Sequence, residues 1–196
     1  MKTKKFTTSQ LTILGLMAGI LFLMAYTPLG YLNIGPLAVT FNVIPVAVCA
    51  IVLGPTGGAI AGAVFGLTSF MQAIGIGGVS ALGSALFQIN PFMTAVQCFG
   101  PRILDGICIG FIYRAVHKKA NTYVSCAVTG FFSAFLNTLF FMTALIVMFG
   151  NTELIRNLMG GHNIIVGCCL MVGVNAISEM VSSTIITACL LYTSPS

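Results

Sequence analysis

The side chains that could do chemistry in this chain are few, and they interrupt long apolar stretches. Across residues 6–113 the only charged residues are Arg102 and Asp105, which both fall in the segment CFGPRILDG. Later apolar stretches contain three more strongly polar residues: Asn137, Asn175 and Glu179. An ionised side chain at the centre of a bilayer costs at least ~2.5–3.5 kcal/mol. If these stretches cross a membrane, the polar groups must face the interior of the protein and find partners there.

Arg102 has several potential partners, and the sequence leaves the choice open. Residues three apart on a helix can meet on one face, so the guanidinium can pair with Asp105. It can also bridge to Glu179 or to amide side chains on other helices. A third role is recognition of a solute, because five N–H donors allow one pairing and still leave donors for a carboxylate or carbonyl group. Pro101 cannot donate to the carbonyl of Gln97, so we expect a kink and a free acceptor close to Arg102.

No catalytic residue, metal site or cofactor is expected. An enzyme needs positioned acids, bases, nucleophiles or metal ligands, and the chain has only three acidic residues and two histidines, far apart in sequence. The motifs HExxH and GxSxG are absent, and GPTGG lacks the Lys-Ser/Thr pair of a phosphate-binding loop. The seven cysteines form no CxxC pair and are expected to be small packing residues. We therefore expect a binding function, with no ATP hydrolysis by this chain.

The composition indicates a membrane protein. Of the 196 residues only 6% are charged and 58% are hydrophobic, whereas a soluble domain usually carries about 25% charged residues. The apolar runs are long and lack strand-like alternation, which favours spanning helices over a barrel. The net charge of +5 comes from a few basic residues at the expected membrane edges. The expected surrounding is therefore the lipid bilayer, and no nucleic-acid partner is predicted.

We predict an all-α membrane protein, folded as one integral membrane domain over residues 1–196. Charged residues and Gly/Pro pairs divide the chain into a six-helix transmembrane bundle, with Ser9 as the N-cap of the first helix. The tight turn GPTGG separates the second and third helices, and residues 74–91 are expected to form a long glycine-rich loop. The expected helices cover residues 9–27, 41–53, 57–73, 91–117, 123–149 and 164–191.

The basic residues predict the orientation of the bundle. One cluster precedes the first helix and another lies between the fourth and fifth helices: Lys2, Lys4, Lys5, Arg114, Lys118 and Lys119. Four spans separate the two clusters, so both lie on the same side of the membrane, and the positive-inside rule makes that side cytoplasmic. Both termini are therefore expected to be cytoplasmic, with the loops after the first, third and fifth helices outside the cell.

The expected solute-binding residues are polar groups at membrane depth or near the outer helix ends. Four polar residues share one face of the last expected helix and should point inward: Asn175, Ser178, Glu179 and Ser182. Asn42 lies near the outer end of its helix, where a cap or loop hydrogen bond is the simpler role and a ligand contact the alternative. The candidates for solute binding are Gln97, Arg102, Asn137, Asn175, Glu179 and Asn42.

Two runs of small residues predict close helix contacts. Gly15 and Gly19 lie four residues apart in the first helix. The third helix repeats this spacing with Gly58, Gly62 and Gly66. Small residues on one face let helix backbones approach closely in lipid, where apolar burial gives little drive for association. Either run can serve packing within the chain or docking onto another membrane subunit.

Two segments resemble a known family. Residues 27–70, TPLGYLNIGPLAVTFNVIPVAVCAIVLGPTGGAIAGAVFGLTSF, resemble the substrate-binding S components of energy-coupling factor (ECF) vitamin transporters. Residues 101–119, PRILDGICIGFIYRAVHKK, are similar to the fourth helix and cytoplasmic hairpin of that family. Gly15 and Gly19 match the small-residue motif of its first helix, where alanines are usual. Six helices with both ends inside the cell also fit the family fold.

The resemblance implies that this chain works with partner subunits. An S component captures a vitamin from outside and then docks on a membrane T component, which is coupled to two cytoplasmic ATPase subunits that hydrolyse the ATP. Toppling of the S component in the membrane releases the solute inside the cell. Gly15 and Gly19 would form the docking surface, and the outer loops would gate the pocket. The chain would be a multi-pass protein of a prokaryotic plasma membrane.

The expected solute is a vitamin, with pantothenate the first candidate and riboflavin the second. The segment PLGYLNIGPL is similar to that of members linked to pantothenate. Arg102 favours a carboxylate-bearing solute, although Asp105 and Glu179 weaken that inference. Two alternatives remain open, namely a membrane assembly subunit that binds no solute and a self-sufficient secondary transporter. An inverted repeat would favour the second alternative, but the two halves of the sequence show no internal symmetry.

Overall fold

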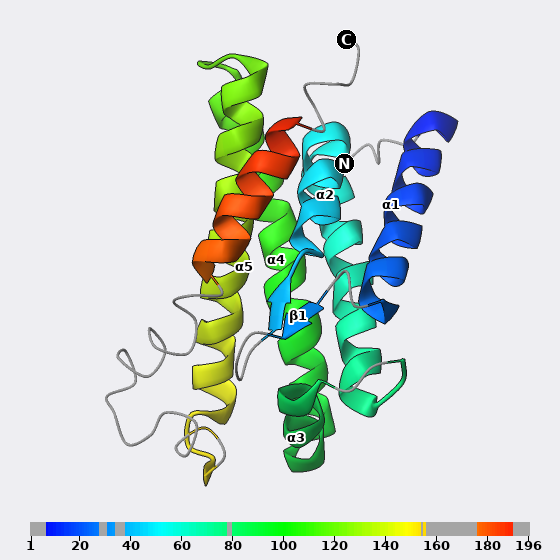
Figure 1. Cartoon of the computed structure of the whole chain (residues 1–196), viewed down its shortest axis with the longest axis vertical. Helices are drawn as coiled ribbons and strands as arrows, with labels where there is room; N and C mark the ends of the chain where they lie inside the picture. Colours follow the sequence, from blue (N-terminus) through cyan, green and yellow to red (C-terminus); the bar gives the residue numbers. More distant parts are fainter. Residues whose placement is uncertain are drawn as a thin grey trace, which may run out of the picture.

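The fold is a bundle of helices with a small β-hairpin between the middle of the bundle and one of its ends (Figure 1). The computed structural model describes residues 7–27, 31–33, 38–77, 80–153, 155 and 176–189. In chain order the elements are α1 (Thr8–Tyr26), β1 (Tyr31–Asn33), β2 (Ala38–Thr40), α2 (Val43–Ile74), α3 (Ala81–Ile89), α4 (Pro91–His117), α5 (Thr122–Phe149) and a last helix, Ala176–Cys189. Four of these helices, α1, α2, α4 and α5, are long and apolar enough to cross a membrane.

Helix α2 reverses its direction at Gly54, so it is a helical hairpin rather than one straight rod. Gly54 has φ 77° and ψ −167°, which interrupt the helix, and it is followed by Pro55, which lacks a backbone donor. A Cβ built on Gly58 would lie 2.9 Å from the Cβ of Ala50, although eight residues of a straight helix rise about 12 Å. The chain therefore doubles back within the segment GPTGG, where the sequence predicted a turn.

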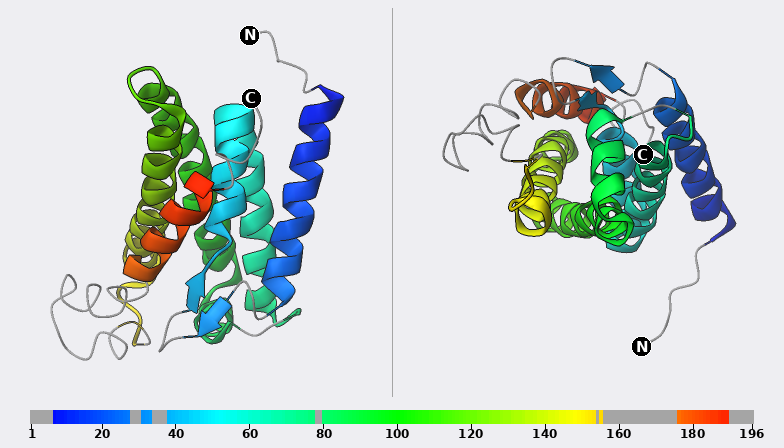
Figure 2. Two further views of the ribbon diagram at one scale, coloured as in Figure 1. Left: turned by 45° about the horizontal axis from the view of Figure 1, so that its top comes forward. Right: turned by 90° about the horizontal axis from the view of Figure 1, so that it is seen from below.

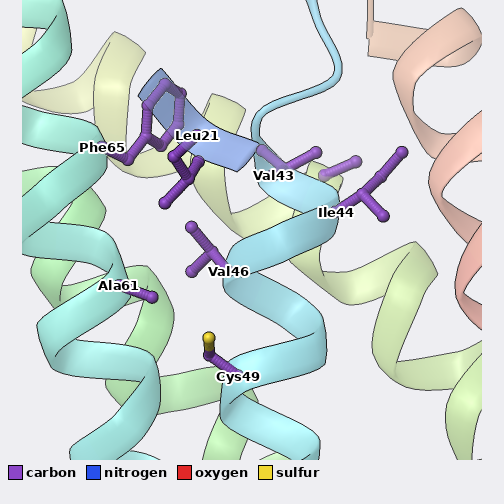
Figure 3. Packing of buried hydrophobic residues seen from close by; sticks show 8 residues of the cluster. Leu21, Val43, Ile44, Val46, Cys49, Ala61 and Phe65 are labelled. Atoms are coloured by element: carbon purple, nitrogen blue, oxygen red, sulfur yellow. The ribbon is translucent and has the colours of Figure 1, made fainter. Parts of the chain in front are cut away.

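The first half of α2, residues 43–53, is the central element of the bundle. Residues 42–50 are all buried, and a helix that is apolar all round packs inside a protein rather than at its surface. Figure 3 shows Cys49 of this half facing Ala61 of the second half. The cluster around them joins α1, both halves of α2 and α5 through Leu21, Val43, Ile44, Val46, Cys49, Ala61, Phe65 and Ala134.

The glycine run of α2 packs directly against the backbone of α4. A Cβ on Gly66 would lie 2.9 Å from the carbonyl oxygen of Cys98. The other two glycines meet α4 backbone even more closely, so that the contacts pair Gly58 with Gly106, Gly62 with Arg102 and Gly66 with Cys98. Successive contacts are four residues apart on each helix, and the residue numbers rise along α2 while they fall along α4, as expected for antiparallel helices at close approach. This run therefore serves packing within the chain.

Helix α1 begins with a capping box and packs mainly against α2 at the edge of the bundle (Figure 2). Its N-cap is Thr7, whose hydroxyl accepts from the backbone N–H of Gln10, while the Gln10 side chain accepts from the backbone N–H of Thr7. The prediction of Ser9 as the N-cap is therefore wrong, because the reciprocal pair starts the helix earlier. Leu21 and Ala25 are the buried residues that hold α1 to the bundle.

The segment between α2 and α4 is not the plain loop that the sequence predicted for residues 74–91. It contains α3, whose N-cap Ser80 accepts from the backbone N–H of Gly83. The buried Leu86 of α3 belongs to an apolar cluster with Leu145 and Phe149 of α5. A second correction concerns the break after α1, where β1 and β2 pair antiparallel with Tyr31 opposite Thr40. The described chain is therefore a helical bundle with two short strands.

The turns that carry basic residues lie at one end of the bundle. The start of α1, the turn at Gly54, the α4–α5 turn and the end of the last helix share this end, and α3 lies at the other (Figure 1). The β-hairpin lies between the middle of the bundle and the α3 end (Figure 1). Arg114, near the end of α4, reaches over the Gly54 turn, where its Nη2 would lie 2.5 Å from a Cβ on that glycine. Lys118 and Lys119 follow in the α4–α5 turn. This is the same-end arrangement that the distribution of basic residues predicted, although the three lysines before α1 lie outside the described residues.

Candidate functional site

Arg102 is buried near the middle of α4 and is held by one hydrogen bond and two aromatic rings. Its exposed fraction is 9%. Nη1 donates to the carbonyl oxygen of Cys98 at 3.0 Å, and the guanidinium carbon lies 4.4 Å from the ring centre of Phe65 and 5.5 Å from that of Phe141. Desolvated cation–π contacts contribute about 2 kcal/mol. The two rings, one from α2 and one from α5, thus fix the guanidinium between these helices.

Asp105 does not occupy the hydrogen-bond donors of the Arg102 guanidinium. In the described part of the chain, no nitrogen of Arg102 lies within 4.0 Å of an Asp105 oxygen, and the buried Arg102 Nε has no hydrogen-bond partner. The bond to Cys98 turns the side chain toward the start of α4, whereas Asp105 lies on the opposite side of Arg102 along the helix. Arg102 therefore keeps donor capacity for a further group, which a closed Arg102–Asp105 pair would have used.

Gln97 connects α4 to α5 and offers a free acceptor. It is 1% exposed, and its Nε2 donates to the carbonyl oxygen of Phe141 at 2.8 Å. Its Oε1 is buried and has no hydrogen-bond partner among the described residues. Helix α4 runs through Pro101 as one element, so this proline does not separate Gln97 from Arg102. The two polar side chains share Phe141 as a neighbour and belong to one site.

Asn42 and Asn137 approach this site from α2 and α5. Asn42 is 0% exposed, makes no capping hydrogen bond, and has no partner for its Oδ1 or Nδ2 in the described structure. Its expected capping role is therefore wrong. Asn137 is also buried and lies one turn before Phe141 on α5. Ser133, one turn earlier still, donates to the carbonyl oxygen of Val43 at 3.5 Å, so this face of α5 reaches the start of α2.

Glu179 is buried on the last helix and interacts with another group of the protein. The last helix packs tightly on α5, because a Cβ on Gly130 would lie 2.6 Å from the carbonyl oxygen of Ser183. The two helices run antiparallel (Figure 1). Because Ser183 faces Gly130, the residue one turn before Ser183, Glu179, lies level with the residue one turn after Gly130, Ala134. Glu179 is therefore placed near the Ala134 level of α5, one turn short of Asn137.

The predicted inward face of the last helix needs correction. Ser178 is exposed, and the hydroxyl of the half-buried Ser182 bonds back to the carbonyl of Ser178. Glu179 is buried, as predicted; Ala176, Ser183 and Thr187 share its face, and Ala188 is buried beside Thr187. The spacing of three and four residues along this face follows the helical period, which turns Ser178 and Ser182 away from the bundle. Asn175, with the rest of the predicted segment 164–175, lies outside the described residues.

Sequence reasoning missed Phe65 and Phe141. The chain contains 15 phenylalanines, and no local pattern separates a ring that holds a guanidinium from a ring that faces lipid. For Phe65 one signal was available, because it stands between Gly62 and Gly66 and a close α2–α4 contact brings its ring to α4. For Phe141 the sequence offers no comparable signal.

Gly15 and Gly19 lie on an open face of α1. Both are exposed, and nothing in the described part of the chain lies within 4 Å of a Cβ built on either. Leu11 and Leu16 beside them are also exposed. This run is therefore not used for packing among the described residues, in contrast to the glycine run of α2.

These features define a multi-pass membrane protein with a buried cation and buried amides in its bundle and, among the described residues, an exposed small-residue face on α1. Residues 9–191 match the family described as ECF transporter, substrate-specific component. The chain belongs to this family. It is a membrane-embedded, substrate-specific subunit of a transporter in the prokaryotic plasma membrane.

Two relatives with assigned names are similar over most of the chain. The pantothenate transporter PanT of Leuconostoc mesenteroides subsp. mesenteroides is 32% identical over 172 aligned residues, which cover 84% of this chain and 78% of the relative. The pantothenic acid transporter PanT of Lactococcus lactis subsp. cremoris is 26% identical over 201 aligned residues, covering 96% of this chain and 94% of the relative.

Proposed function

We propose that this chain is the S component of an ATP-driven ECF importer and binds pantothenate from the outer side of the membrane. The observation that carries the proposal is the buried guanidinium of Arg102, which Phe65 and Phe141 hold while its Nε has no hydrogen-bond partner among the described residues. The names of both relatives support pantothenate and give no support to riboflavin.

The chemistry of pantothenate matches the free groups of the site. Its carboxylate suits Arg102, because charge-assisted bonds from guanidinium to carboxylate are among the strong ones. Its hydroxyl groups can donate to the free Oε1 of Gln97, and its amide can pair with Asn42 or Asn137. Glu179 of the last helix and Asn175, which precedes that helix in the sequence, remain candidates, because a carboxylate and an amide can accept from the two hydroxyls.

The orientation and the partners follow from the charges and from the open face of α1. The end of the bundle with Arg114, Lys118 and Lys119 is assigned to the cytoplasm, and the end with α3 to the outside. The Gly15–Gly19 face then docks on the membrane T component, because small residues permit close helix contact in lipid. Two cytoplasmic ATPase subunits supply the ATP hydrolysis for which this chain has no residues.

Pantothenate binding to the purified chain in lipid nanodiscs tests the proposal. We expect saturable binding by calorimetry, with riboflavin as a vitamin that does not bind. Arg102→Ala should lower the affinity at least about tenfold, because a hydrogen bond to a charged group contributes about 1.5–3 kcal/mol. Lys118→Ala, which removes an exposed charge from the α4–α5 turn, is the control and should bind normally.

A folded chain without affinity for pantothenate would overturn the proposal. Native mass spectrometry of the protein from cells grown with the vitamin gives a second readout, in which a bound mass equal to that of pantothenate is expected. Absence of any bound solute, together with no thermal shift across a vitamin panel, would favour a membrane assembly subunit. Pantothenate uptake by vesicles containing this chain alone would favour the secondary transporter.

A further inference from the structure

We propose that Gln97 selects solutes that carry a hydrogen-bond donor close to their carboxylate, and that in pantothenate this donor is the amide N–H. The inference rests on the proposed function, in which Arg102 binds the carboxylate. It narrows that function, because it chooses the amide N–H over the hydroxyl groups as the partner of Gln97 Oε1. The substrate class is then an N-acylated β-amino acid.

The side chain of Gln97 is held so that only its acceptor is free. Nε2 donates to the carbonyl oxygen of Phe141 at 2.8 Å, whereas Oε1 is buried and has no hydrogen-bond partner among the described residues. The residue is 1% exposed, so this oxygen does not reach the surface. Turning the amide over would set Oε1 against the Phe141 carbonyl, and two acceptors cannot bond to each other. A group that binds to this side chain must therefore donate.

The backbone carbonyl of Gln97 adds a second acceptor at the same residue. In an α-helix this oxygen accepts from the N–H four residues later, and residue 101 is a proline, which has no N–H. Gln97 and Pro101 are both buried, so this oxygen lies on the inner face of α4. Two acceptors of one residue thus lack their usual donors, which favours a solute with an N–H or O–H group.

Arg102 and Gln97 approach each other at Cys98 and Phe141. Nη1 of Arg102 donates to the carbonyl oxygen of Cys98 at 3.0 Å, which brings the guanidinium back along α4 to the residue next to Gln97. Its carbon lies 5.5 Å from the ring centre of Phe141, the residue whose carbonyl holds the Gln97 amide. The Arg102 Nε has no partner among the described residues. Donors for an anion and an acceptor for an N–H group therefore lie next to each other on α4.

The two buried acidic side chains of the described bundle lie away from Gln97. Asp105 follows Gln97 by eight residues, a rise of about 12 Å along α4. Glu179 is placed near Ala134, which precedes Phe141 by seven residues, or about 10 Å along α5. Both carboxyl groups are thus nearer the basic end of the bundle. An anion beside Gln97 is separated from each of them by about two helix turns, while the guanidinium lies closer.

The covalent structure of pantothenate decides which donor meets Gln97. Its amide N–H is two carbons from the carboxylate, whereas its hydroxyl groups lie beyond the amide carbonyl. A carboxylate on the guanidinium therefore brings the N–H, rather than a hydroxyl, to Oε1. The same arrangement disfavours an ester, which has no N–H, and a dicarboxylate, whose second anionic group would face an acceptor. A site built to bond a donor rejects an analogue without it, because its own buried acceptor then stays unpaired.

The test compares pantothenate with its ester isostere, in which an oxygen atom replaces the amide N–H and every other group is kept. Calorimetry in nanodiscs gives the ratio of the two affinities, and we expect the wild type to favour pantothenate about tenfold or more. Gln97→Met keeps the length of the side chain but has no oxygen acceptor, so the ratio should fall below about threefold. Loss of the bond to Phe141 acts on both solutes and cancels in the ratio.

Gln72→Met is the matched control. Gln72 is also buried, and its Nε2 donates to the carbonyl oxygen of Ala25 at 2.7 Å, so the change removes the same kind of bond at the contact between α1 and α2. It should leave the ratio at about tenfold. If Gln97→Met does not give a monodisperse protein, Gln97→Leu removes the same acceptor and carries the same expectation.

The outcomes separate this inference from the proposed function. An unchanged ratio in Gln97→Met overturns the role of Gln97 even if the wild type binds pantothenate, and so does a wild type that binds the amide and the ester equally. Deoxy analogues of pantothenate give a third comparison. If their loss of affinity, rather than that of the ester, disappears in Gln97→Met, the acceptor serves a hydroxyl and the inference is wrong. Failure of the folded wild-type chain to bind pantothenate overturns the proposed function and this inference with it.

Discussion

Gly62 of α2 lies directly against the backbone carbonyl of Arg102 on α4. A Cβ at this glycine would overlap that carbonyl and lie 3.2 Å from the Cα of Ile103. The contact sets the separation of the two helices at the level of the site, and Phe65, three residues later on α2, carries its ring to the Arg102 guanidinium. The glycine run and the candidate site are therefore parts of one arrangement.

Gly62→Ala should destabilise the protein by about 1–3 kcal/mol, because the added methyl meets backbone atoms that cannot move aside. We also expect weaker solute binding, since any separation of α2 from α4 moves Phe65 away from Arg102. Thermal unfolding in detergent measures the first effect and calorimetry the second. Gly15→Ala is the control, because its added Cβ would meet nothing within 4 Å in the described structure. Equal melting temperatures for the two variants would contradict the prediction.

Phe65→Leu should lower pantothenate affinity by about tenfold while leaving the fold intact. The leucine keeps the apolar packing but removes the ring face, and with it a cation–π contact worth about 2 kcal/mol. The effect should vanish in an Arg102→Ala background, since the ring acts through the guanidinium. Phe132→Leu, at a half-exposed ring on α5, is the comparison and should bind as the wild type does. An unchanged effect of Phe65→Leu without Arg102 would show that the ring contacts the solute itself.

Gly15→Leu and Gly19→Leu should block assembly with the T component and the ATPase subunits while sparing solute binding. A leucine on this face keeps the helices apart, and close approach is the means by which small residues promote association in lipid. Co-purification of the subunits and calorimetry of the isolated chain separate the two effects. Leu16→Phe enlarges a neighbouring exposed residue and should assemble normally. Loss of solute binding in the glycine variants would assign the run to internal packing.

Much of the helical framework could be predicted because charges and helix breakers are sharp signals in an apolar chain. The expected helix at residues 91–117 coincides with α4, since Asn90 and Pro91 start it and the basic turn after His117 ends it. The reversal at Gly54 was visible in the segment GPTGG. Arg102 and Gln97 stood out as candidates because polar groups at membrane depth need partners, and the structure brings them together around Phe141.

The remaining features depend on tertiary contacts that leave little trace in the sequence. Helix α3 forms because Leu86 packs in a buried cluster with residues of α5. The sequence did not predict this helix, because the glycines around it favoured a loop. The inward face of the last helix could not be read from polar residues alone, because Ser182 bonds to its own backbone instead of pointing inward. The roles of Asn42 and Phe65 depend on the half-helix 43–53 lying at the centre of the bundle.

The contact between α5 and the last helix leads to a prediction of higher stability. Ser183 and Thr187 lie against α5 at Gly130, and their hydroxyls are buried without a hydrogen-bond partner among the described residues. A buried hydroxyl without a partner carries a desolvation cost of about 1–3 kcal/mol. Ser183→Ala combined with Thr187→Val removes both groups and leaves the apolar contacts in place. We therefore expect the double variant to melt at a higher temperature than the wild type.

Thr129→Val on α5 is the control, because its buried hydroxyl donates to the carbonyl oxygen of Ser125 at 2.6 Å. Removing a satisfied hydrogen bond should lower the free energy of unfolding by about 0.5–1.5 kcal/mol. The two variants should therefore shift the melting temperature in opposite directions, although each replaces hydroxyls on the same pair of facing helices. If the Ser183 and Thr187 double variant is instead destabilised like Thr129→Val, these hydroxyls have partners such as water. The contact between α5 and the last helix is then hydrated rather than dry.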